Sequence, residues 1–244
     1  MGLSGKTAIV TAASRGIGRA VAERLGADGA NVVVDYNASE GAAQEVVNTI
    51  TAAGGKAIAV QADISVPADV LRLFDEAQAA FGSIDILVNN AGITVVGPTA
   101  HLPEADFDRA FALNVKGAFL AMQQAALRLN DNGRIVNIST GYVKAPNPYV
   151  GVYVATKAAV DQIGASLAKE VGERGITVNS VAPGLTDTDG VAPEVRAQAD
   201  VYIGMTPLGR FGQPRDIADV VAFLASEQAR WVTGQVISAT GGLA

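Results

Sequence analysis

Residues 6–18 of this chain read Lys-Thr-Ala-Ile-Val-Thr-Ala-Ala-Ser-Arg-Gly-Ile-Gly. The apolar first half predicts a short buried strand, and the glycines at positions 16 and 18 mark a tight turn after it. Helical spacing of small and apolar residues follows as far as Gly29, and residues 31–36 predict a second strand. A strand, a glycine turn, a helix and a strand form the unit that binds dinucleotides, because the turn presents backbone amides to the pyrophosphate. A glycine turn alone also suits an ordinary strand-to-helix connection.

Helices and strands continue to alternate beyond residue 36. The predicted helices cover residues 39–53, 67–81, 104–129, 151–171 and 214–225, and the predicted strands cover 56–61, 84–88, 133–139, 176–181 and 234–238. This alternation predicts an open α/β sheet of parallel strands with helices on both faces. No linker or repeat divides residues 1–244, so we expect a single domain. The polar segment at about 185–206 is predicted to be either a lid over a substrate or a solvated loop.

The composition excludes several classes of function. Hydrophobic residues make up 49% of the 244 residues and charged residues 17%, which is enough apolar material for one large core. The net charge of -6, without a cluster of lysines and arginines, argues against nucleic acid as a partner. The absence of cysteine excludes disulfides and thiolate metal sites, and the single histidine, His101, has no metal partner in the sequence, so we expect no metal. No apolar run reaches the ~18 residues of a membrane span. No signal peptide precedes the first strand, so we expect a cytoplasmic protein without a membrane partner.

A tyrosine and a lysine, Tyr153 and Lys157, stand four residues apart in a predicted helix. On a helix these side chains are neighbours on one face. An ammonium beside a phenol lowers the phenol pKa below its usual value of about 10, so Tyr153 can exchange a proton with a reacting oxygen. Ser139 ends a predicted buried strand, at the edge where open α/β sheets bind ligands. A tyrosine–lysine pair without further support is more often a solvated pair on a helix surface.

Five motifs in this chain resemble those of the short-chain dehydrogenase/reductase family. The turn from Thr11 to Gly18 is similar to the family motif T-G-x-x-x-G-x-G, except that Ala12 stands at the first glycine. Alanine is tolerated there if its φ is negative, whereas a positive φ costs about 1 kcal/mol or more. The other motifs are Asn89-Asn90-Ala91-Gly92, Asn114, Ser139 with Tyr153-x-x-x-Lys157, and Pro183-Gly184-Leu185-Thr186-Asp187-Thr188. In the last motif Thr186 stands where the family has a branched apolar residue.

The resemblance covers nearly the whole chain and implies both a fold and a reaction. The implied fold is one Rossmann-type, doubly wound domain with a seven-stranded parallel sheet of order 3-2-1-4-5-6-7. The implied reaction is reversible hydride transfer between a nicotinamide cofactor and a carbonyl or alcohol. By this resemblance, Ser139 holds the substrate oxygen and Tyr153 protonates it during reduction. Lys157 lowers the pKa of Tyr153 and holds the nicotinamide ribose, and Asn114 anchors the proton relay.

The resemblance also implies which residues contact the cofactor. Besides Tyr153 and Lys157, these are Thr11, Ser14, Arg15, Gly16, Ile17, Gly18, Tyr36, Asn37, Ser39, Asp63, Ile64, Asn90, Ala91, Gly92, Pro183, Gly184, Thr186 and Thr188. Asp63 is expected to contact the adenine, although a carboxylate before Pro67 also suits a turn or helix cap. Asn89 is expected to serve the sheet alone. Asn114 also has the sequence context of a buried amide satisfied within the protein.

The choice between NADP(H) and NAD(H) depends on the end of the second strand. A carboxylate there hydrogen-bonds the ribose 2′-OH of NAD, whereas a basic residue accommodates the 2′-phosphate of NADP. In the family pattern the selecting position is Tyr36, which leaves Asp35 facing the other way. Arg15 then supplies a cation for the phosphate, with Ser14, Asn37 and Ser39 as further hydrogen-bond donors. We therefore expect NADP(H) to be preferred and NAD(H) to be possible; the preference reverses if Asp35 reaches the ribose.

Within the family, the chain looks most similar to bacterial 3-oxoacyl-carrier-protein reductases and related ketoreductases. A small carbonyl or alcohol substrate is implied, and alcohol, sugar and steroid dehydrogenases that use NAD remain alternatives. A family member that lost catalysis and acts as a binding protein is a further alternative, against which the Asn-Ser-Tyr-Lys set argues. A nucleotide-sugar epimerase is disfavoured because such relatives carry a larger C-terminal region.

The predicted helix at 151–171 is apolar nearly all round, as expected for a helix buried on more than one side. One side would cover the sheet, and small alanines on the other suit close packing against a second copy of the chain. We therefore expect a homo-oligomer, with the tetramer common in this family as the predicted form and the 104–129 helix sharing the contact.

Overall fold

The computed structural model describes residues 2–191 and 193–244 and contains one seven-stranded, all-parallel sheet. The strands are β1 (Thr7–Val10), β2 (Asn31–Tyr36), β3 (Lys56–Gln61), β4 (Ile86–Asn89), β5 (Arg134–Ile138), β6 (Thr177–Pro183) and β7 (Val236–Ala239). Their order, β3-β2-β1-β4-β5-β6-β7, confirms the predicted Rossmann-type topology. The order reverses between β1 and β4, so the ligand crevice of such a sheet lies at the carboxyl ends of these strands.

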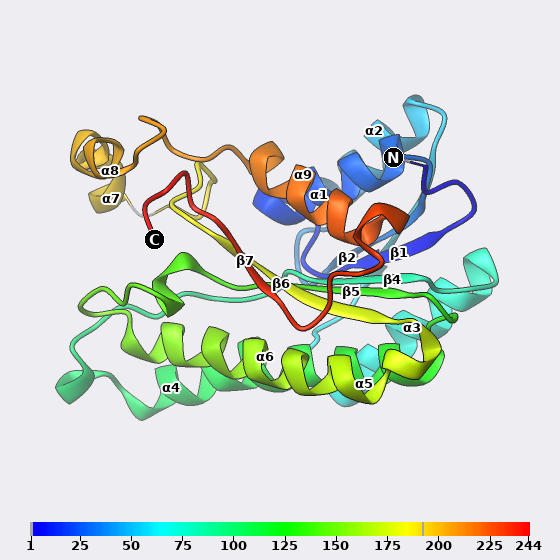
Figure 1. Cartoon of the computed structure of the whole chain (residues 1–244), viewed down its shortest axis with the longest axis horizontal. Helices are drawn as coiled ribbons and strands as arrows, with labels where there is room; N and C mark the ends of the chain where they lie inside the picture. Colours follow the sequence, from blue (N-terminus) through cyan, green and yellow to red (C-terminus); the bar gives the residue numbers. More distant parts are fainter. Residues whose placement is uncertain (1, 192) are drawn as a thin grey trace.

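Helices cover both faces of the sheet (Figure 1). They are α1 (Gly16–Ala27), α2 (Glu40–Ala52), α3 (Pro67–Phe81), α4 (Glu104–Ala110), α5 (Ala118–Arg128), α6 (Gly151–Glu170), α7 (Pro193–Ala197), α8 (Ala199–Met205) and α9 (Pro214–Ala225). On one face α1, α2 and α9 pack on the sheet, and on the other face α3, α5 and α6 do. Each face has its own buried aliphatic core, as the near-continuous apolar strands require.

The predicted helix at 104–129 is interrupted by a π-helical segment, η2 (Phe111–Gly117), between α4 and α5. The rings of Phe107 and Phe111 stack at this junction, with centroids 4.4 Å apart. Such π segments are rare and often occur at functional sites. Asn114 lies inside η2 and is buried, so the irregular turn carries one of the predicted site residues.

The predicted lid at 185–206 contains α7 and α8, which Figure 1 shows apart from the sheet. Ala192 in this segment lies outside the described residues. A side chain at Gly16 would come within 3.5 Å of Thr188, so the segment passes directly over the glycine turn. An ion pair of 2.8 Å joins Asp187 to Arg196 within the segment. The segment therefore lies against the glycine turn, and its role as a lid stays a prediction.

None of the helices in residues 2–191 and 193–244 is long and apolar enough to cross a lipid bilayer.

Candidate active site

In the glycine turn, Ala12 has a backbone geometry that is strained for alanine. Ala12 has a φ of +50°, in the left-handed region, which costs a residue with a Cβ about 1 kcal/mol or more. Its N–H donates to the Asp35 carboxylate at 2.9 Å, and this bond fixes the turn against the end of β2. A Cβ at Gly18 would lie 2.5 Å from the Ala12 carbonyl oxygen and from Asn90 Nδ2, so only glycine fits there. Gly16, with a φ of +56°, also has the backbone conformation that favours glycine.

Hydrogen bonds join the ends of β1 and β4 beside this turn. Thr11 Oγ1 accepts from the backbone N–H groups of Asn90 (2.9 Å) and Ala91 (3.0 Å). The Asn90 amide donates to the carbonyl oxygens of Thr11 (2.9 Å) and Ala12 (3.1 Å). Asn89 donates to Asn137 Oδ1 at 2.9 Å between β4 and β5, which confirms its predicted role in the sheet. Thr11 and Asn90 therefore shape the crevice, and their direct contact with a cofactor stays a prediction.

The residues present fit a dinucleotide. The glycine turn leads directly into α1, whose N-terminus suits an anionic pyrophosphate. Arg15 stands exposed just before this helix. A Cβ at Gly92 would lie 3.2 Å from both Asn114 Oδ1 and Lys157 Nζ, so the missing side chain leaves the space beside the candidate catalytic residues open.

The Asp35 carboxylate lies against the glycine turn, and its orientation away from a bound ribose stays a prediction. Its side chain is buried, and one oxygen accepts from Ala12 while the other has no hydrogen-bond partner among the described residues. Burial raises the pKa of Asp35 to about 7, although the bond from Ala12 opposes this. Tyr36 is half-buried and Asn37 is exposed at the strand end. This geometry leaves Arg15 as the charged candidate for a 2′-phosphate.

Helix α6 brings Tyr153 and Lys157 to one face of the helix, as predicted from their spacing. The Thr140 and Thr94 side chains lie close to the Tyr153 phenol and act on its pKa as hydrogen-bond partners. We expected its pKa to be lowered. Instead, burial raises the pKa of Tyr153, and the hydrogen bonds to the two threonines only partly oppose this. Tyr153 is thus held as a protonated phenol, which is the form that a proton donor needs.

The prediction that the Ser139 hydroxyl faces the reacting oxygen needs correction. Ser139 is buried, and its Oγ donates to Asp161 Oδ2 at 2.7 Å. The hydroxyl beside the Tyr153 phenol belongs to Thr140. Thr140 has extended backbone angles, and successive side chains of an extended segment point to opposite sides. The sequence interpretation was therefore wrong by one residue at the end of β5.

Lys157 is buried, and its Nζ donates to the backbone carbonyl oxygen of Ile138 at 2.8 Å. This bond fixes the ammonium at the end of β5. Burial lowers the pKa of Lys157 to about 8, and the negative charge of Asp161 opposes this shift. The lysine is thereby poised to lose its proton closer to neutral pH than an exposed lysine does.

Asn114 is satisfied within the protein, as its sequence context suggested. Its Oδ1 accepts from the Ile93 N–H at 2.8 Å, and its Nδ2 donates to the Ile93 carbonyl oxygen (2.9 Å) and to Thr156 Oγ1 (3.0 Å). These bonds tie η2 to α6 and to the segment after β4. Asn114 lies beside Lys157 across the gap at Gly92. Its part in a proton relay stays a prediction.

Other predicted contacts follow the ends of β3 and β6. Asp63 Oδ1 accepts from the N–H (2.9 Å) and the hydroxyl (2.7 Å) of Ser65, so this carboxylate shapes a turn, and its adenine contact stays a prediction. The Ile64 side chain is buried in the core. A Cβ at Gly184 would lie 2.8 Å from Thr240 Cα, which explains this glycine by close packing. Thr186 is buried and donates to the Gly184 carbonyl oxygen at 3.0 Å.

Other predictions concern His101 and metal ligands. His101 is exposed in the short 3-10 helix η1 (Thr99–His101). In the described part of the chain there is no group of three or more His, Cys, Asp or Glu side chains that could hold a metal ion.

Sequence reasoning missed three residues of this site, namely Thr140, Thr94 and Asp161. Asp161 follows Lys157 by four residues, so the spacing that paired Tyr153 with Lys157 could also have revealed it. Thr140 directly follows Ser139, to which the resemblance gives this role. Nothing in the local pattern pointed to Thr94.

Comparison with known proteins gives one family and several full-length relatives. The family described as Enoyl-(Acyl carrier protein) reductase matches residues 11–244. An uncharacterized oxidoreductase of Methylorubrum extorquens is 48% identical over 99% of this chain and 98% of its own length. The 3-oxoacyl-[acyl-carrier-protein] reductase FabG of Staphylococcus aureus is 43% identical over 98% of each chain. Among solved structures, the angucycline C-6 ketoreductase LanV with bound NADP matches with a TM-score of 0.93 and 44% identity, covering 99% of this chain and 96% of LanV.

Proposed function

Because this chain belongs to the short-chain dehydrogenase/reductase family of NAD(P)-dependent oxidoreductases, we propose that it is a ketoreductase that prefers NADP(H). The observation that carries the proposal is the close approach of Thr140 to Tyr153, with the buried Lys157 one helical turn further along α6. Two hydroxyl groups and one ammonium thus converge at the carboxyl edge of the sheet, next to a glycine turn that fits a dinucleotide.

The residues of this site would perform the following steps. A substrate carbonyl oxygen would accept hydrogen bonds from Thr140 and Tyr153, which orients the carbonyl and stabilises the negative charge that develops on its oxygen. Tyr153 would donate its phenolic proton to that oxygen during reduction and take it back in the reverse direction. The Lys157 ammonium would stabilise the phenolate that forms. A nicotinamide cofactor, when bound, supplies or accepts the hydride.

The preference for NADP(H) rests on Arg15 and on the position of Asp35. Arg15 is exposed before α1 and free to reach a 2′-phosphate, whereas the Asp35 carboxylate is occupied beneath the turn and would not repel it. The relative LanV was crystallised with NADP. Ser14, Asn37 and Ser39 are the proposed further donors to the phosphate.

We propose a ketone on an apolar framework as the substrate. Large apolar side chains stand exposed on the segments that follow β4 and precede α6, and on and after α8, namely Val96, Tyr149, Met205 and Leu208. The Gly97 N–H donates to the Tyr149 carbonyl oxygen at 2.7 Å, which joins the first two segments. A Cβ at Gly141 would lie 2.8 Å from Thr240 Cγ2, and one at Gly241 would lie 2.9 Å from Thr206 Cγ2, so the end of α8 lies near Thr140. The family relative LanV is named for reducing an angucycline, a polycyclic compound.

A 3-oxoacyl thioester is the second candidate, because the Staphylococcus aureus relative is named for that reaction. The two candidates are separated by initial rates of NADPH oxidation with 2-tetralone, a bicyclic aromatic ketone, and with acetoacetyl-CoA. We expect the higher kcat/KM for 2-tetralone. Tyr153→Phe is the control, and it should lose about 10²–10⁴-fold with either substrate. The absence of turnover with any ketone, or full activity of Tyr153→Phe, would refute the proposed function.

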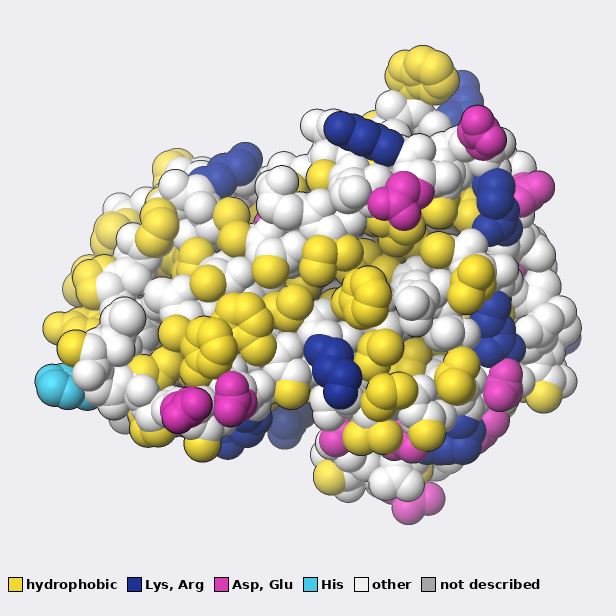
Figure 2. Space-filling view, turned by 90° about the horizontal axis from the view of Figure 1, so that it is seen from below, with side chains coloured by type: hydrophobic (Ala, Val, Ile, Leu, Met, Phe, Trp, Pro, Cys, Tyr) yellow, Lys and Arg dark blue, Asp and Glu magenta, His cyan; other side chains and the backbone are white. Residues whose placement is uncertain are grey.

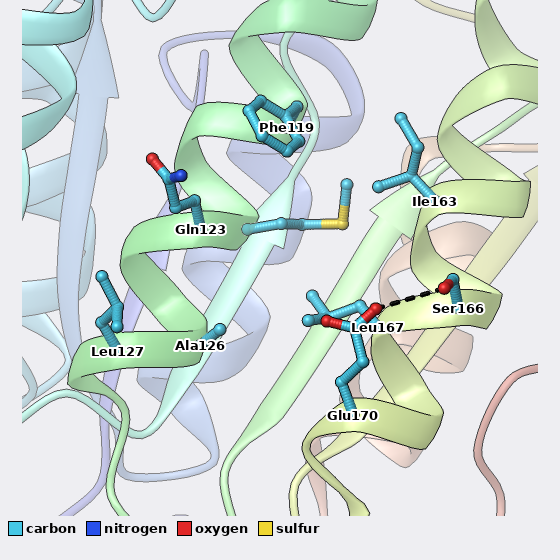
Figure 3. Close-up of a pocket in the computed structure, with 9 residues that line it drawn as sticks. Phe119, Gln123, Ala126, Leu127, Ile163, Ser166, Leu167 and Glu170 are labelled. Atoms are coloured by element: carbon cyan, nitrogen blue, oxygen red, sulfur yellow. Dashed lines mark hydrogen bonds between the residues drawn. The ribbon is translucent and has the colours of Figure 1, made fainter.

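We also propose that two copies of the chain meet across α5 and α6. A groove between these helices is lined by Phe119, Met122, Gln123, Ala126 and Leu127 of α5 and by Ile163, Ser166, Leu167 and Glu170 of α6 (Figure 3). Phe119 and Leu127 are 43% and 73% exposed, which is unusual for large apolar side chains of a monomer. Figure 2 shows hydrophobic side chains gathered across this face of the molecule. We propose that the predicted tetramer uses this face. The groove and its exposed apolar side chains support this proposal.

A further inference from the structure

One charged side chain beside the proposed catalytic residues has no part in the reaction described above. Asp161 continues the row of Tyr153 and Lys157 along α6, again four residues further on. Its side chain is buried, with 4% of its surface exposed. Removing a carboxylate from water is costly unless other groups compensate, so a buried aspartate beside an active site calls for a physical reason.

Two serines from neighbouring strands bind this carboxylate. Ser139, at the end of β5, donates to Asp161 Oδ2 at 2.7 Å, and Ser180 of β6 lies close enough to the same carboxylate to lower its pKa. The other oxygen, Oδ1, has no hydrogen-bond partner among the described residues. On balance the pKa of Asp161 is raised, because burial outweighs the two serines and the charge of Lys157, which lower it. The serines therefore stabilise the ionised form.

The groups around Lys157 leave Asp161 as its electrostatic partner. From β5, the Ile138 carbonyl oxygen accepts from Nζ. The π segment η2 contributes the amide of Asn114, and α6 itself contributes the neutral phenol of Tyr153. Tyr142, in the 3-10 helix η3 (Gly141–Val143), is also a phenol and acts on Tyr153. Burial disfavours the ammonium form of Lys157, and the negative charge of Asp161 favours it.

We propose that Asp161 is a positioning residue for the reduction, an inference that rests on the proposed function. Its carboxylate keeps Lys157 in the ammonium form. Through Ser139, the same carboxylate fixes the end of β5 so that the next residue, Thr140, faces Tyr153. One buried charge thus serves both the proton donor and the residue that orients the substrate.

The test separates the charge of Asp161 from its hydrogen bonds. Asp161→Asn keeps an oxygen that accepts from the serines but removes the charge, whereas Ser139→Ala removes one hydrogen bond and keeps the charge. Reduction requires the ammonium, so kcat/KM falls as the pH rises through the pKa of Lys157. Without the Asp161 charge that pKa falls, and we expect this alkaline limb to move to lower pH by about one unit in Asp161→Asn. In Ser139→Ala the rate should fall and the limb should move less than in Asp161→Asn, because Ser180 still stabilises the ionised carboxylate.

If kcat/KM fell at the same alkaline pH in the parent and in Asp161→Asn, the proposal would be overturned. Equal shifts of that pH in Asp161→Asn and Ser139→Ala would also overturn it. Asp161→Ser, which removes the charge and keeps an oxygen that can accept a hydrogen bond in a smaller side chain, replaces Asp161→Asn if thermal melting shows that the latter does not fold. The titration of Lys157 can also be followed without turnover, by NMR of a ¹³C-labelled lysine side chain assigned with Lys157→Met. That measurement must show the same lower pKa in the charge-free variant. An inactive parent refutes the proposed function, whereas an unchanged Lys157 titration refutes this inference.

Discussion

The Thr140 hydroxyl lies beside the Tyr153 phenol, whereas Ser139, one residue earlier, donates to Asp161 at 2.7 Å on the other side of the chain. The two adjacent hydroxyl groups thus have different tasks. The first faces the crevice and the second holds a buried carboxylate. This division determines which hydroxyl can bind a substrate oxygen.

Thr140→Val should therefore lower kcat/KM for ketone reduction by about 10²–10³-fold, because it removes one donor to the developing oxyanion and keeps the side-chain shape. NADPH binding, measured by fluorescence titration, should not change. Thr140→Ser should retain most of the activity, since it keeps the hydroxyl. Ser139→Ala should have the smaller effect of the two hydroxyl deletions. A larger loss in Ser139→Ala than in Thr140→Val would restore Ser139 as the residue that binds the substrate.

Arg15→Ala should lower kcat/KM with NADPH by about 10- to 100-fold, because a charge-assisted hydrogen bond to phosphate contributes about 1.5–3 kcal/mol. The value with NADH should stay nearly constant, since NADH lacks the 2′-phosphate. Arg19→Ala is the matched control, because Arg19 lies one turn further along α1 and pairs with Glu23. A parent enzyme that prefers NADH would contradict the assignment, as would an unchanged cofactor ratio in Arg15→Ala.

Ala12→Gly should stabilise the protein by about 0.5–1 kcal/mol, because glycine adopts a positive φ without the Cβ penalty. For a chain of this size the melting temperature should rise by about 1–4 °C. Thermal unfolding followed by circular dichroism measures the change. Ala13→Gly is the control, since Ala13 is a buried neighbour that does not share the positive φ and should lose stability. Equal losses in both variants would show that the Ala12 methyl group contributes more by packing than it costs in strain.

Asp35→Asn should change how stability depends on pH. The pKa of Asp35 is about 7 in the folded protein against an ordinary value of 3.8, so between about pH 4 and pH 7 the unfolded chain binds fewer protons than the folded one. The contribution of Asp35 to stability therefore falls as the pH rises through this range. The amide that replaces the carboxyl group is neutral, and its carbonyl oxygen can still accept from Ala12. Urea unfolding should show the variant more stable than the parent at pH 8, with a smaller difference at pH 5.

The exposed Asp189→Asn variant serves as the control for Asp35→Asn, and its stability should follow that of the parent at both pH values. A difference between Asp35→Asn and the parent that is the same at pH 5 and pH 8 would show that the carboxyl group does not titrate in this range.

Leu127→Glu should disrupt the proposed assembly, because it places a charge on the apolar groove between α5 and α6. Light scattering should give the parent a mass that is a multiple of 24.8 kDa, and the variant a smaller mass at the same concentration. Leu71→Glu is the control, since Leu71 is an exposed leucine on α3, outside the groove. A parent that is monomeric at micromolar concentration would refute the proposed contact.

The sequence was sufficient for the sheet and for the placement of the crevice, because apolar strands and glycine turns have strong local patterns. Gly18 illustrates this, since its close contact with Ala12 and Asn90 is what a glycine at that position indicates. The predictions that were wrong concern features that depend on tertiary contacts. Whether Ser139 or Thr140 faces Tyr153 depends on how the chain leaves β5, and the pKa of Tyr153 depends on how deeply α6 is buried. The pattern of apolar residues likewise could not distinguish the π-helical segment η2 from a continuous helix, because both bury the same residues.

The π-helical turn of η2 sets the angular relation between α4 and α5. Each residue of an α-helix advances the side chains by about 100°, so a wider turn offsets every residue that follows it. Removing one residue from 111–117 would rotate either Asn114 away from Ile93, or Phe119 and Leu127 away from the groove beside α6. A single irregular turn thus sets the orientation of the Asn114 amide and of the proposed contact face relative to each other. Changes of chain length in this segment would disturb chemistry and assembly together.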